Sequence, residues 1–183
     1  KTLNKFEFGE GFQRWIRILY TDPSAVVKNN GYFSDEFIIS RGVRQGCPVS
    51  ALLFVLCMEV LATHVRQKDS ISGLPLDESS NIKILQYADD STFFVKNHRE
   101  LNEVIRTLEI FGKIAGTKLN LSKCEGLWIG SAKNRQDNCN LCNIRWPRDP
   151  IKYLGIYIGH DKQECYNLNY NTKLMDIDHV LKQ

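Results

Sequence analysis

The sequence lacks the features that mark exported and membrane-spanning chains. Its first residues contain neither an apolar segment nor the small-residue cleavage site of a secretory signal, and there is no initiator methionine. The longest apolar stretch, 51–65, is interrupted by Glu59 and falls short of the roughly 20 residues that cross a bilayer. We therefore expect an intracellular protein of the nucleus or cytoplasm, not secreted and with no membrane partner. We also expect 51–65 to be a core helix and the chain to be part of something longer.

The sequence also has little net charge, no internal repeat and no low-complexity tract. Its 24 Lys and Arg residues oppose 21 Asp and Glu residues, which leaves a net charge of +3. This small excess is compatible with a nucleic-acid partner but does not require one. The composition, 43% hydrophobic and 25% charged over 183 residues, is that of an ordinary globular protein and argues against disorder. The function must therefore be sought in the motifs.

The six cysteines are spread irregularly through the chain, and without an export signal we expect reduced thiols. Cys139 and Cys142 are spaced as a metal-binding pair, with His160 and Cys165 downstream. The spacing of the second pair is poor, and a strand-like segment lies between the two pairs. Because a single C-x-x-C is easily met by chance, a zinc site is the weaker interpretation.

Apolar side chains recur at helical spacing in 10–20 and 99–115, and the apolar segment 51–66 is a third predicted helix. Ser50 is the predicted N-cap of the 51–66 helix, because its hydroxyl can accept a bond from a free N–H of the first turn. Gly116 is the predicted C-cap of the 99–115 helix.

Several β-prone runs lie between and after these helices. The runs 24–28 and 32–40 flank an Asn-Asn-Gly turn and predict a hairpin. Further strands are predicted at 118–121, 126–129 and 151–158, and 170–181 begins a last helix. The mixture predicts an α+β fold, a mostly antiparallel sheet packed with helices.

The most informative stretch is Tyr87-Ala88-Asp89-Asp90, between the β-prone runs 82–87 and 92–95. Two adjacent carboxylates at a hairpin tip repel each other unless a cation lies between them, and a divalent metal fits that need. The tip also lacks the glycine or asparagine that tight hairpins usually need. The alternative stays open, because Asp is a common turn residue and two carboxylates cost little in water.

A basic loop with two glycines, 41–50, leads into the helix of 51–66. A glycine loop that opens a helix is a place where polyanions can approach backbone donors. An ordinary loop-to-helix junction explains the same residues equally well.

Four motifs now stand in a fixed order along the chain. They are 44–50 (Arg-Gln-Gly-Cys-Pro-Val-Ser) followed by Leu-Leu-Phe, 87–90 (Tyr-Ala-Asp-Asp), 116–120 (Gly-Thr-Lys-Leu-Asn) with Lys123, and 153–155 (Tyr-Leu-Gly). They resemble motifs B, C, D and E of reverse transcriptases, most of all those of LINE-type non-LTR retrotransposons. The group II intron type is a poorer match, because Gly-Cys-Pro-Val-Ser looks more LINE-like.

The resemblance implies a right-hand polymerase palm, with a partial fingers and palm domain over 1–160 and a linker with the start of the thumb over 161–183. It implies an RNA-directed DNA polymerase that acts on an RNA template, a DNA primer and deoxynucleoside triphosphates. The implied cofactor is Mg²⁺, with Mn²⁺ as a substitute. Asp89 and Asp90 would bind the metal at the tip of the catalytic hairpin.

The other motifs imply further roles. Gln45 and Gly46 would lie at the nucleotide pocket, and Lys123 would act as a general acid toward pyrophosphate. The primer grip would consist of Tyr153, Leu154 and Gly155. Simpler readings remain for several of these residues: a helix-entry turn at 45–46, a solvated Lys123 and a core Leu154. Phosphate or template contacts by Arg41 and Arg44 are weaker expectations, because surface arginines are usually solvated.

Two departures from the family pattern stand out. Ala51 replaces the usual proline, a mild change at the start of a helix. Motif A, the strand with the other metal-binding aspartate, is absent before the 10–20 helix, and Asp22 and Asp35 lie in the wrong elements to replace it. We therefore expect the isolated segment to be inactive, with an unpaired sheet edge and a tendency to aggregate. The alternatives are a non-catalytic nucleic-acid-binding remnant of a retrotransposon, or a decayed element without a role.

Overall fold

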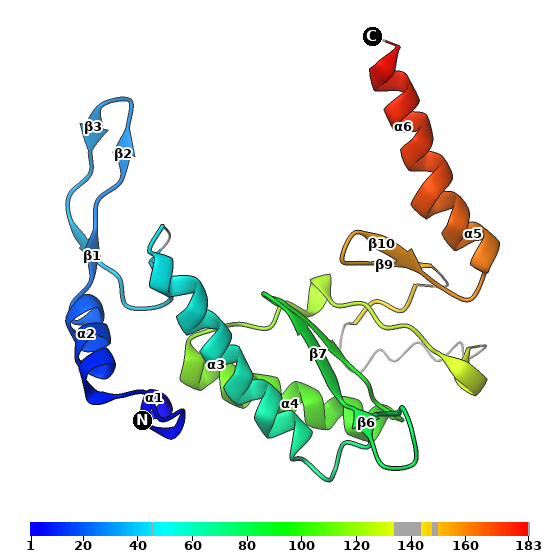
Figure 1. Cartoon of the computed structure of the whole chain (residues 1–183), viewed down its shortest axis with the longest axis horizontal. Coiled ribbons are helices and arrows are strands. Elements are labelled where there is room, and N and C mark those ends of the chain that lie inside the picture. Colours follow the sequence, from blue (N-terminus) through cyan, green and yellow to red (C-terminus); the bar gives the residue numbers. More distant parts are fainter. Residues whose placement is uncertain (45, 134–143, 148–149, 183) are drawn as a thin grey trace. The chain divides into compact units, whose positions relative to one another are not determined.

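The structure is a computed structural model that describes residues 1–44, 46–133, 144–147 and 150–182. The chain divides into two compact units, Lys1–Leu119 and Asn120–Gln183, each of which combines helices with short antiparallel strands (Figure 1). The predicted α+β class is therefore confirmed. The division of the chain at 160 stays a prediction.

The first unit begins with helices and a long two-stranded hairpin. The elements are α1 (Thr2–Lys5), α2 (Glu10–Tyr20), β1 (Ser24–Ala25), β2 (Lys28–Asn29), β3 (Tyr32–Phe33) and β4 (Phe37–Ile38). Strand β2 pairs with β3 and β1 pairs with β4, both antiparallel. Gly31 takes a φ of 85° in the turn, a conformation that glycine adopts without strain. The predicted helix 10–20 and the hairpin after it are both confirmed.

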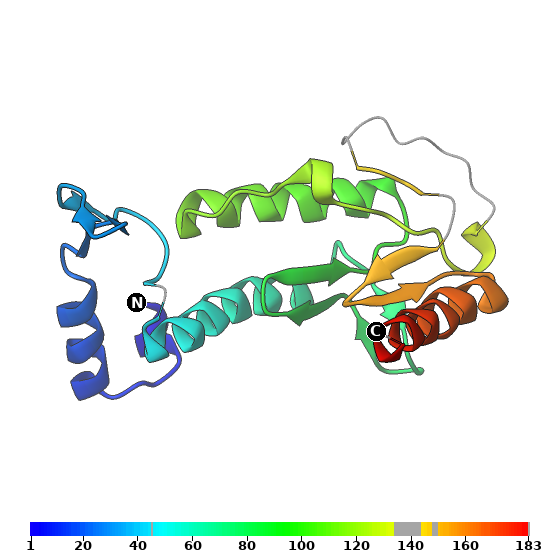
Figure 2. The same cartoon turned by 90° about the horizontal axis from the view of Figure 1, so that it is seen from above.

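The core of the first unit lies where two helices meet a second hairpin. Helices α3 (Pro48–Arg66) and α4 (His98–Ala115) lie side by side (Figure 2), and β7 (Ile84–Tyr87), which pairs with β8 (Asp90–Phe93), packs against α3. The small hairpin of β5 (Leu74–Pro75) and β6 (Asn81–Ile82) precedes β7. The buried apolar residues are Leu61, Ala62, Val65, Ile71, Ile84 and Val104.

Helix α3 is a core helix only in its second half. Leu61, Ala62 and Val65 are buried, whereas Leu52 and Val55 in the first half are exposed. By length and composition alone α3 is also apolar enough to cross a membrane, a test that core helices of soluble proteins pass as well. The uncovered first half shows that apolar composition along a helix does not by itself say how deeply each turn is buried.

The predicted N-cap of α3 is wrong. The helix begins at Pro48 and its N-cap is Cys47, because proline at the first helical position needs no hydrogen-bond partner for its nitrogen. Ser50 lies inside the first turn, and its hydroxyl is hydrogen-bonded to the Tyr20 hydroxyl at 2.9 Å. Ser50 therefore ties α3 to α2.

The C-terminal end of α4 matches the prediction, and its N-terminus is capped by Asn97, for which no prediction was made. The Asn97 side chain accepts a hydrogen bond from the backbone N–H of Glu100 at the N-terminus. Gly116 ends the helix with a φ of 73°, the left-handed conformation of a glycine cap. The predicted helix 99–115 is confirmed.

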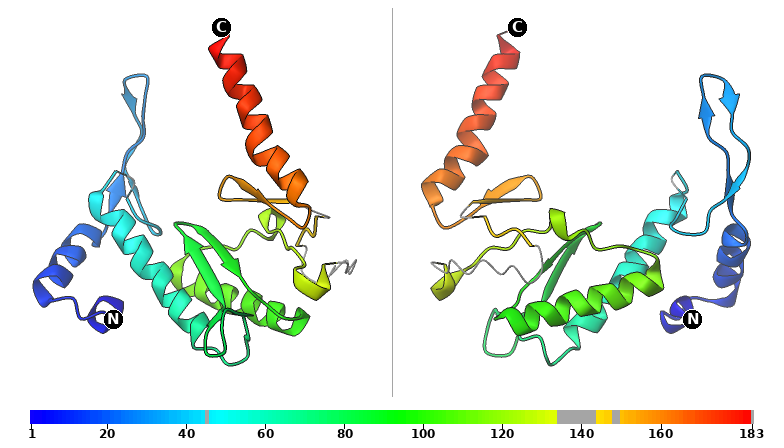
Figure 3. Two further views of the ribbon diagram at one scale, coloured as in Figure 1. Left: turned by 45° about the vertical axis from the view of Figure 1, so that its right-hand side comes forward. Right: turned by 180° about the vertical axis from the view of Figure 1, so that it is seen from behind.

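The second unit is helical at its end and irregular at its beginning. Its elements are the short 3₁₀ turns η1 (Leu121–Lys123) and η2 (Gly130–Ala132), strands β9 (Ile151–Tyr153) and β10 (Ile156–Ile158), and then α5 (Lys162–Tyr166), the π-helical η3 (Asn167–Asn171) and α6 (Thr172–Leu181). Figure 3 shows α5, η3 and α6 as one helical run after β10. The predicted last helix therefore exists but begins earlier, at Lys162.

Three predicted strands of the second half are wrong in detail. The segment 118–121 is irregular until η1 begins, and 126–129 has no strand, because only an isolated bridge joins Glu125 to Arg145 there. The segment 151–158 is a hairpin of two strands, since Leu154 and Gly155 form a turn with φ values of 46° and 85°. Cys139 and Cys142 lie outside the described residues, so the zinc interpretation is not tested.

Candidate active site

The acidic pair lies at the tip of the β7–β8 hairpin, as the sequence predicts. Tyr87 pairs with Asp90, so that Ala88 and Asp89 alone form the connecting turn. Ala88 takes a φ of 50°, a conformation that costs a non-glycine residue roughly 1–2 kcal/mol. Backbone strain of this kind persists where the surrounding structure fixes it, and it clusters at functional sites.

The two carboxylates have no partner among the described residues. Asp89 and Asp90 are exposed, and no side chain of the described ranges donates a hydrogen bond or forms an ion pair with either carboxylate. Adjacent anions without a cationic neighbour attract a cation from solution. Carboxylate oxygens are the ligands that Mg²⁺ prefers, and polymerase-type sites bind Mg²⁺ through one or two carboxylates together with substrate phosphates. The tip therefore fits a divalent metal.

The hairpin is anchored to the core by its other end. Ile84 is 6% exposed and packs in the cluster of Leu61, Val65 and Val104, whereas Leu85, the next residue, is 43% exposed on the opposite face. The Lys83 ammonium donates to the backbone carbonyl of Lys68 at 2.8 Å. The packed base fixes the direction in which the tip projects.

A buried carboxylate joins the segments on either side of the hairpin. The Glu100 carboxylate accepts hydrogen bonds from the Ser72 hydroxyl at 2.7 Å and from the Lys96 backbone N–H at 3.0 Å. Burial by itself raises the pKa of Glu100, but these hydrogen bonds stabilise the anion and leave the pKa below its ordinary value. Glu100 therefore stays charged at neutral pH and holds the loop before β5 against the start of α4.

The glycine loop before α3 adopts the backbone that its glycines allow. Gly46 has a φ of 81°, and a Cβ at this position would meet no atom within 4 Å. Glycine is therefore required here by the backbone conformation and not by a close neighbour. Gln45 lies outside the described residues, so its predicted place in a nucleotide pocket is not tested.

The two arginines of this loop, Arg41 and Arg44, lie near other groups of the first unit. A Cβ at Gly116 would lie 3.4 Å from the Arg41 Cδ, so the Arg41 stem lies beside the C-terminus of α4, where a cation is favourable. Arg44 lies close enough to Cys47 for its charge to affect the thiol. The pKa of the Cys47 thiol is lowered, first by a hydrogen bond from the Val49 N–H, then by one from the Ser50 side chain, and to a smaller extent by the Arg44 charge. The structure thus gives Arg41 a place in the fold, and its contact with phosphate stays a prediction.

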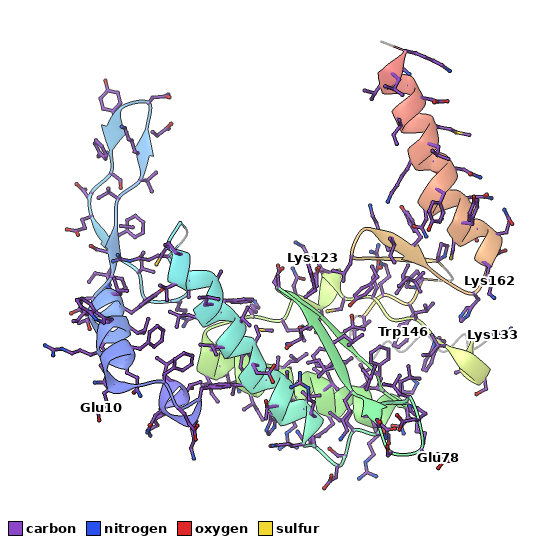
Figure 4. All side chains as sticks on the ribbon, viewed as in Figure 1. Glu10, Glu78, Lys123, Lys133, Trp146 and Lys162 are labelled. Carbon is purple, nitrogen blue, oxygen red and sulfur yellow. The ribbon has the colours of Figure 1, made fainter. Side chains whose placement is uncertain are left out.

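The remaining predicted site residues belong to the second unit. Lys123 is exposed at the end of η1 (Figure 4), and its ammonium has no hydrogen-bond or ion-pair partner within the described ranges. Tyr153 ends β9, and Leu154 and Gly155 form the tight turn to β10. Leu154 is exposed, so the alternative reading of Leu154 as a core residue is wrong.

The structure brings Asp89 and Asp90 together on one tip of the first unit. Their grouping with Lys123 and with 153–155 stays a prediction, because those residues belong to the other unit. In the part of the chain that the structure describes, no group of three or more His, Cys, Asp and Glu side chains could hold a metal ion. The described residues thus offer a pair of carboxylate ligands and not a complete metal cage.

A family model described as "Reverse transcriptase (RNA-dependent DNA polymerase)" matches residues 1–158. The "Transposon TX1 uncharacterized 149 kDa protein" of Xenopus laevis is 30% identical over 88% of this chain and 12% of its own length. The "Retrovirus-related Pol polyprotein from type-2 retrotransposable element R2DM" of Drosophila melanogaster is 30% identical over 85% of this chain and 15% of its own length. A "Retrovirus-related Pol polyprotein from type-1 retrotransposable element R2" of Popillia japonica is 25% identical over 96% of this chain and 26% of its own length. The chain thus spans about a quarter or less of these relatives.

Proposed function

Because the chain belongs to the reverse transcriptase family and is similar to a Pol polyprotein of a retrotransposable element, we propose that Asp89 and Asp90 hold the divalent metal of a primer-extending polymerase. The observation that carries the proposal is the pair of exposed, unpartnered carboxylates on a strained turn whose base is packed into the core. The reaction adds deoxynucleoside triphosphates to a DNA primer on an RNA template.

In this proposal the hairpin supplies position and charge. When Mg²⁺ is bound, it activates the primer 3′-hydroxyl and stabilises the leaving pyrophosphate. The Asp89 and Asp90 oxygens would hold the metal, and the packing of Ile84 in the core anchors the hairpin that carries them. The exposed position of the tip leaves room for substrate phosphates to complete the coordination.

The finer architecture is part of the same proposal. Hairpin β7–β8 with helices α3 and α4 forms the palm, 1–160 holds the partial fingers and palm, and 161–183 leads into the thumb. The antiparallel hairpin with helices packed on one face supports this assignment.

The other motif residues take the roles that their motifs imply. Gln45 and Gly46 contact the incoming nucleotide, and the positive φ of Gly46 supports a loop whose backbone amides face the ligand. Lys123 is the general acid toward pyrophosphate, which its exposed and unpaired ammonium supports. Tyr153, Leu154 and Gly155 hold the primer end, and the projecting turn at Leu154 supports a contact of this kind.

We further propose that the 183 residues do not polymerise on their own, because the described residues offer only the Asp89–Asp90 pair for a reaction that uses two metal ions. A primer-extension assay with Mg²⁺, an RNA template and a DNA primer tests this. We expect no incorporation, and robust template-dependent synthesis would refute it.

The second candidate function is nucleic-acid binding without chemistry, which the incomplete metal cage favours. Binding of the same RNA template and DNA primer, measured with and without Mg²⁺, distinguishes it from the polymerase site. Binding of this kind is salt-sensitive and survives the double substitution Asp89→Ala and Asp90→Ala. Binding that depends on both carboxylates and on Mg²⁺ would instead favour the polymerase site.

A further inference from the structure

An open cavity of about 340 Å³ lies in the second unit, between hairpin β9–β10 and the helical run that follows it. Tyr157 of β10 forms one wall, and Tyr166 and Tyr170 lie on the helical side. The volume is at the small end of the roughly 300–1,000 Å³ of ligand-binding pockets. None of the residues predicted for the polymerase site lines this cavity, whereas Cys165 of the weaker zinc interpretation does.

The cavity has walls that are fixed to each other. The backbone N–H of Tyr157 donates to the Asn169 side-chain oxygen at 2.7 Å, and the Asn169 amide nitrogen donates to the Tyr157 carbonyl at 2.8 Å. The Asn169 side chain thus pairs both backbone hydrogen-bonding groups of Tyr157 at the edge of β10, as a neighbouring strand would. The hairpin and the helix are therefore held at a set separation, and the space between them is built into this unit.

The aromatic side chains of the cavity are available to a ligand. Tyr166 and Tyr170 are 52% and 58% exposed, one helical turn apart, with ring centroids 5.0 Å from each other. The two rings contact each other and still leave apolar surface exposed, and flat aromatic rings favour a flat partner. Nucleobases that are free of a duplex stack on tyrosine rings in this way.

The charges at the cavity favour an anion. Lys162, labelled in Figure 4, is the first residue of α5. It lines the cavity, and the Lys152 ammonium lies 5.7 Å from the centroid of the Tyr157 ring. No carboxylate is among the described residues that line it. A ligand with a flat aromatic part and a negative backbone matches this set, whereas an apolar peptide would leave the ammonium groups without a partner.

We propose that this cavity, defined by Tyr157, Lys162, Tyr166 and Tyr170, binds an unpaired nucleotide of a single-stranded nucleic acid. The base stacks on the tyrosines, and Lys162 and Lys152 contact the adjoining phosphates. The proposal rests on the proposed function for its class of ligand, nucleic acid, but not on the metal at Asp89 and Asp90. It places a strand-binding site in the second unit that is separate from the primer-holding turn at 153–155.

The test is fluorescence anisotropy of the 183-residue chain with a labelled 12-nucleotide RNA, the DNA of the same sequence and a blunt duplex of that DNA. We expect Tyr166→Ala and Tyr170→Ala each to weaken single-strand binding about tenfold, because each removes one stacking partner. The phenylalanine variants of both positions retain the ring and should bind as the unmodified chain does. Lys162→Gln should reduce the slope of log K against log salt by about 0.7, the value for one phosphate of a single strand.

The matched control is Tyr32→Ala, which removes an 82% exposed tyrosine from β3 in the other unit and should leave binding unchanged. Equal affinity for RNA and DNA supports a site that reads the base and phosphate, and tighter RNA binding supports one that also reads the 2′-hydroxyl. The inference is overturned if the duplex binds as tightly as the single strands, if Tyr170→Ala binds normally, or if no single strand binds. These failures leave metal binding at Asp89 and Asp90 intact, so the two proposals fail separately.

Discussion

Replacement of Ile84 by alanine tests whether the base of the acidic hairpin is packed as described. Ile84 is 6% exposed among Leu61, Val65 and Val104, and its truncation leaves a cavity between β7 and the two helices. A buried isoleucine truncated in this way costs about 2–5 kcal/mol. At a urea dependence of about 2 kcal/mol per molar, a loss of about 3 kcal/mol lowers the unfolding midpoint by about 1.5 M.

Leu85→Ala is the matched control, since Leu85 is the next residue on the same strand and faces away from the core with 43% exposure. Its truncation should cost about 1 kcal/mol or less, because much of the side chain is already in water. The assay is urea unfolding followed by far-UV circular dichroism, at a protein concentration that keeps the chain monomeric. Equal midpoint shifts for the two variants would refute the described orientation of the hairpin.

Three further predictions follow from individual residues. Ala88→Gly should raise the free energy of unfolding by about 1 kcal/mol in the same urea titration, because glycine takes the φ of 50° without strain. Ala62→Gly, at a buried position inside α3, should lower it, and a loss of stability in both variants would contradict the strained turn. Hydrogen bonds from the Ser80 and Ser79 side chains and backbone N–H groups lower the pKa of Asp77 from its ordinary value of 3.8 to about 2. The stabilisation of the loop by the Asp77 carboxylate is therefore complete above about pH 4 and is lost as the pH falls through about 2. The amide NMR shifts of Ser79 and Ser80 should titrate with a midpoint near pH 2. A midpoint near pH 4 would show that these hydrogen bonds are absent. Light scattering should show self-association as the protein concentration rises. The reason is that hairpin β7–β8 pairs with no other strand among the described residues, and Leu85 and Tyr87 on it are exposed. A monodisperse monomer that unfolds cooperatively would contradict this.

Much of the first unit could be predicted from the sequence because its signals are local. The β-prone run 82–87 predicts the first strand of the acidic hairpin, and Gly116 predicts the end of α4. The start of α3 also had a local signal, Pro48 at the first helical position, which outweighs the capping ability of Ser50.

The second unit was harder to predict because its structure depends on contacts between distant residues. The run 126–129 is apolar enough for a strand. The Trp128 and Trp146 rings stack with centroids 4.6 Å apart, Trp146 fills the space over Gly126, and among the described residues only the Glu125–Arg145 bridge pairs the start of this run. The glycine in the middle of 151–158 was a signal for a turn. Asp161 and Glu164 form a local start signal for α5, with the Asp161 carboxylate bonded to the Glu164 N–H.

The acidic tip was predicted from the sequence, whereas the tyrosine cavity was not. Asp89 and Asp90 are adjacent in sequence, so their proximity needs no knowledge of the fold. Tyr157 and Tyr170 line one cavity because Asn169 holds its helix against the edge of β10. No periodicity or motif in the sequence predicts this contact.

The central claim is that the hairpin tip binds a divalent metal, and a Mn²⁺ titration followed by electron paramagnetic resonance tests it most directly. The signal of free Mn²⁺ is measured with the chain, with the double variant Asp89→Asn and Asp90→Asn, and with Asp35→Asn, which removes an exposed carboxylate elsewhere in the same unit. We expect the double variant to bind Mn²⁺ more weakly by at least about tenfold, since loss of even indirect ligand support costs that much, and Asp35→Asn to match the unmodified chain. Superimposable titrations for all three proteins would contradict the claim.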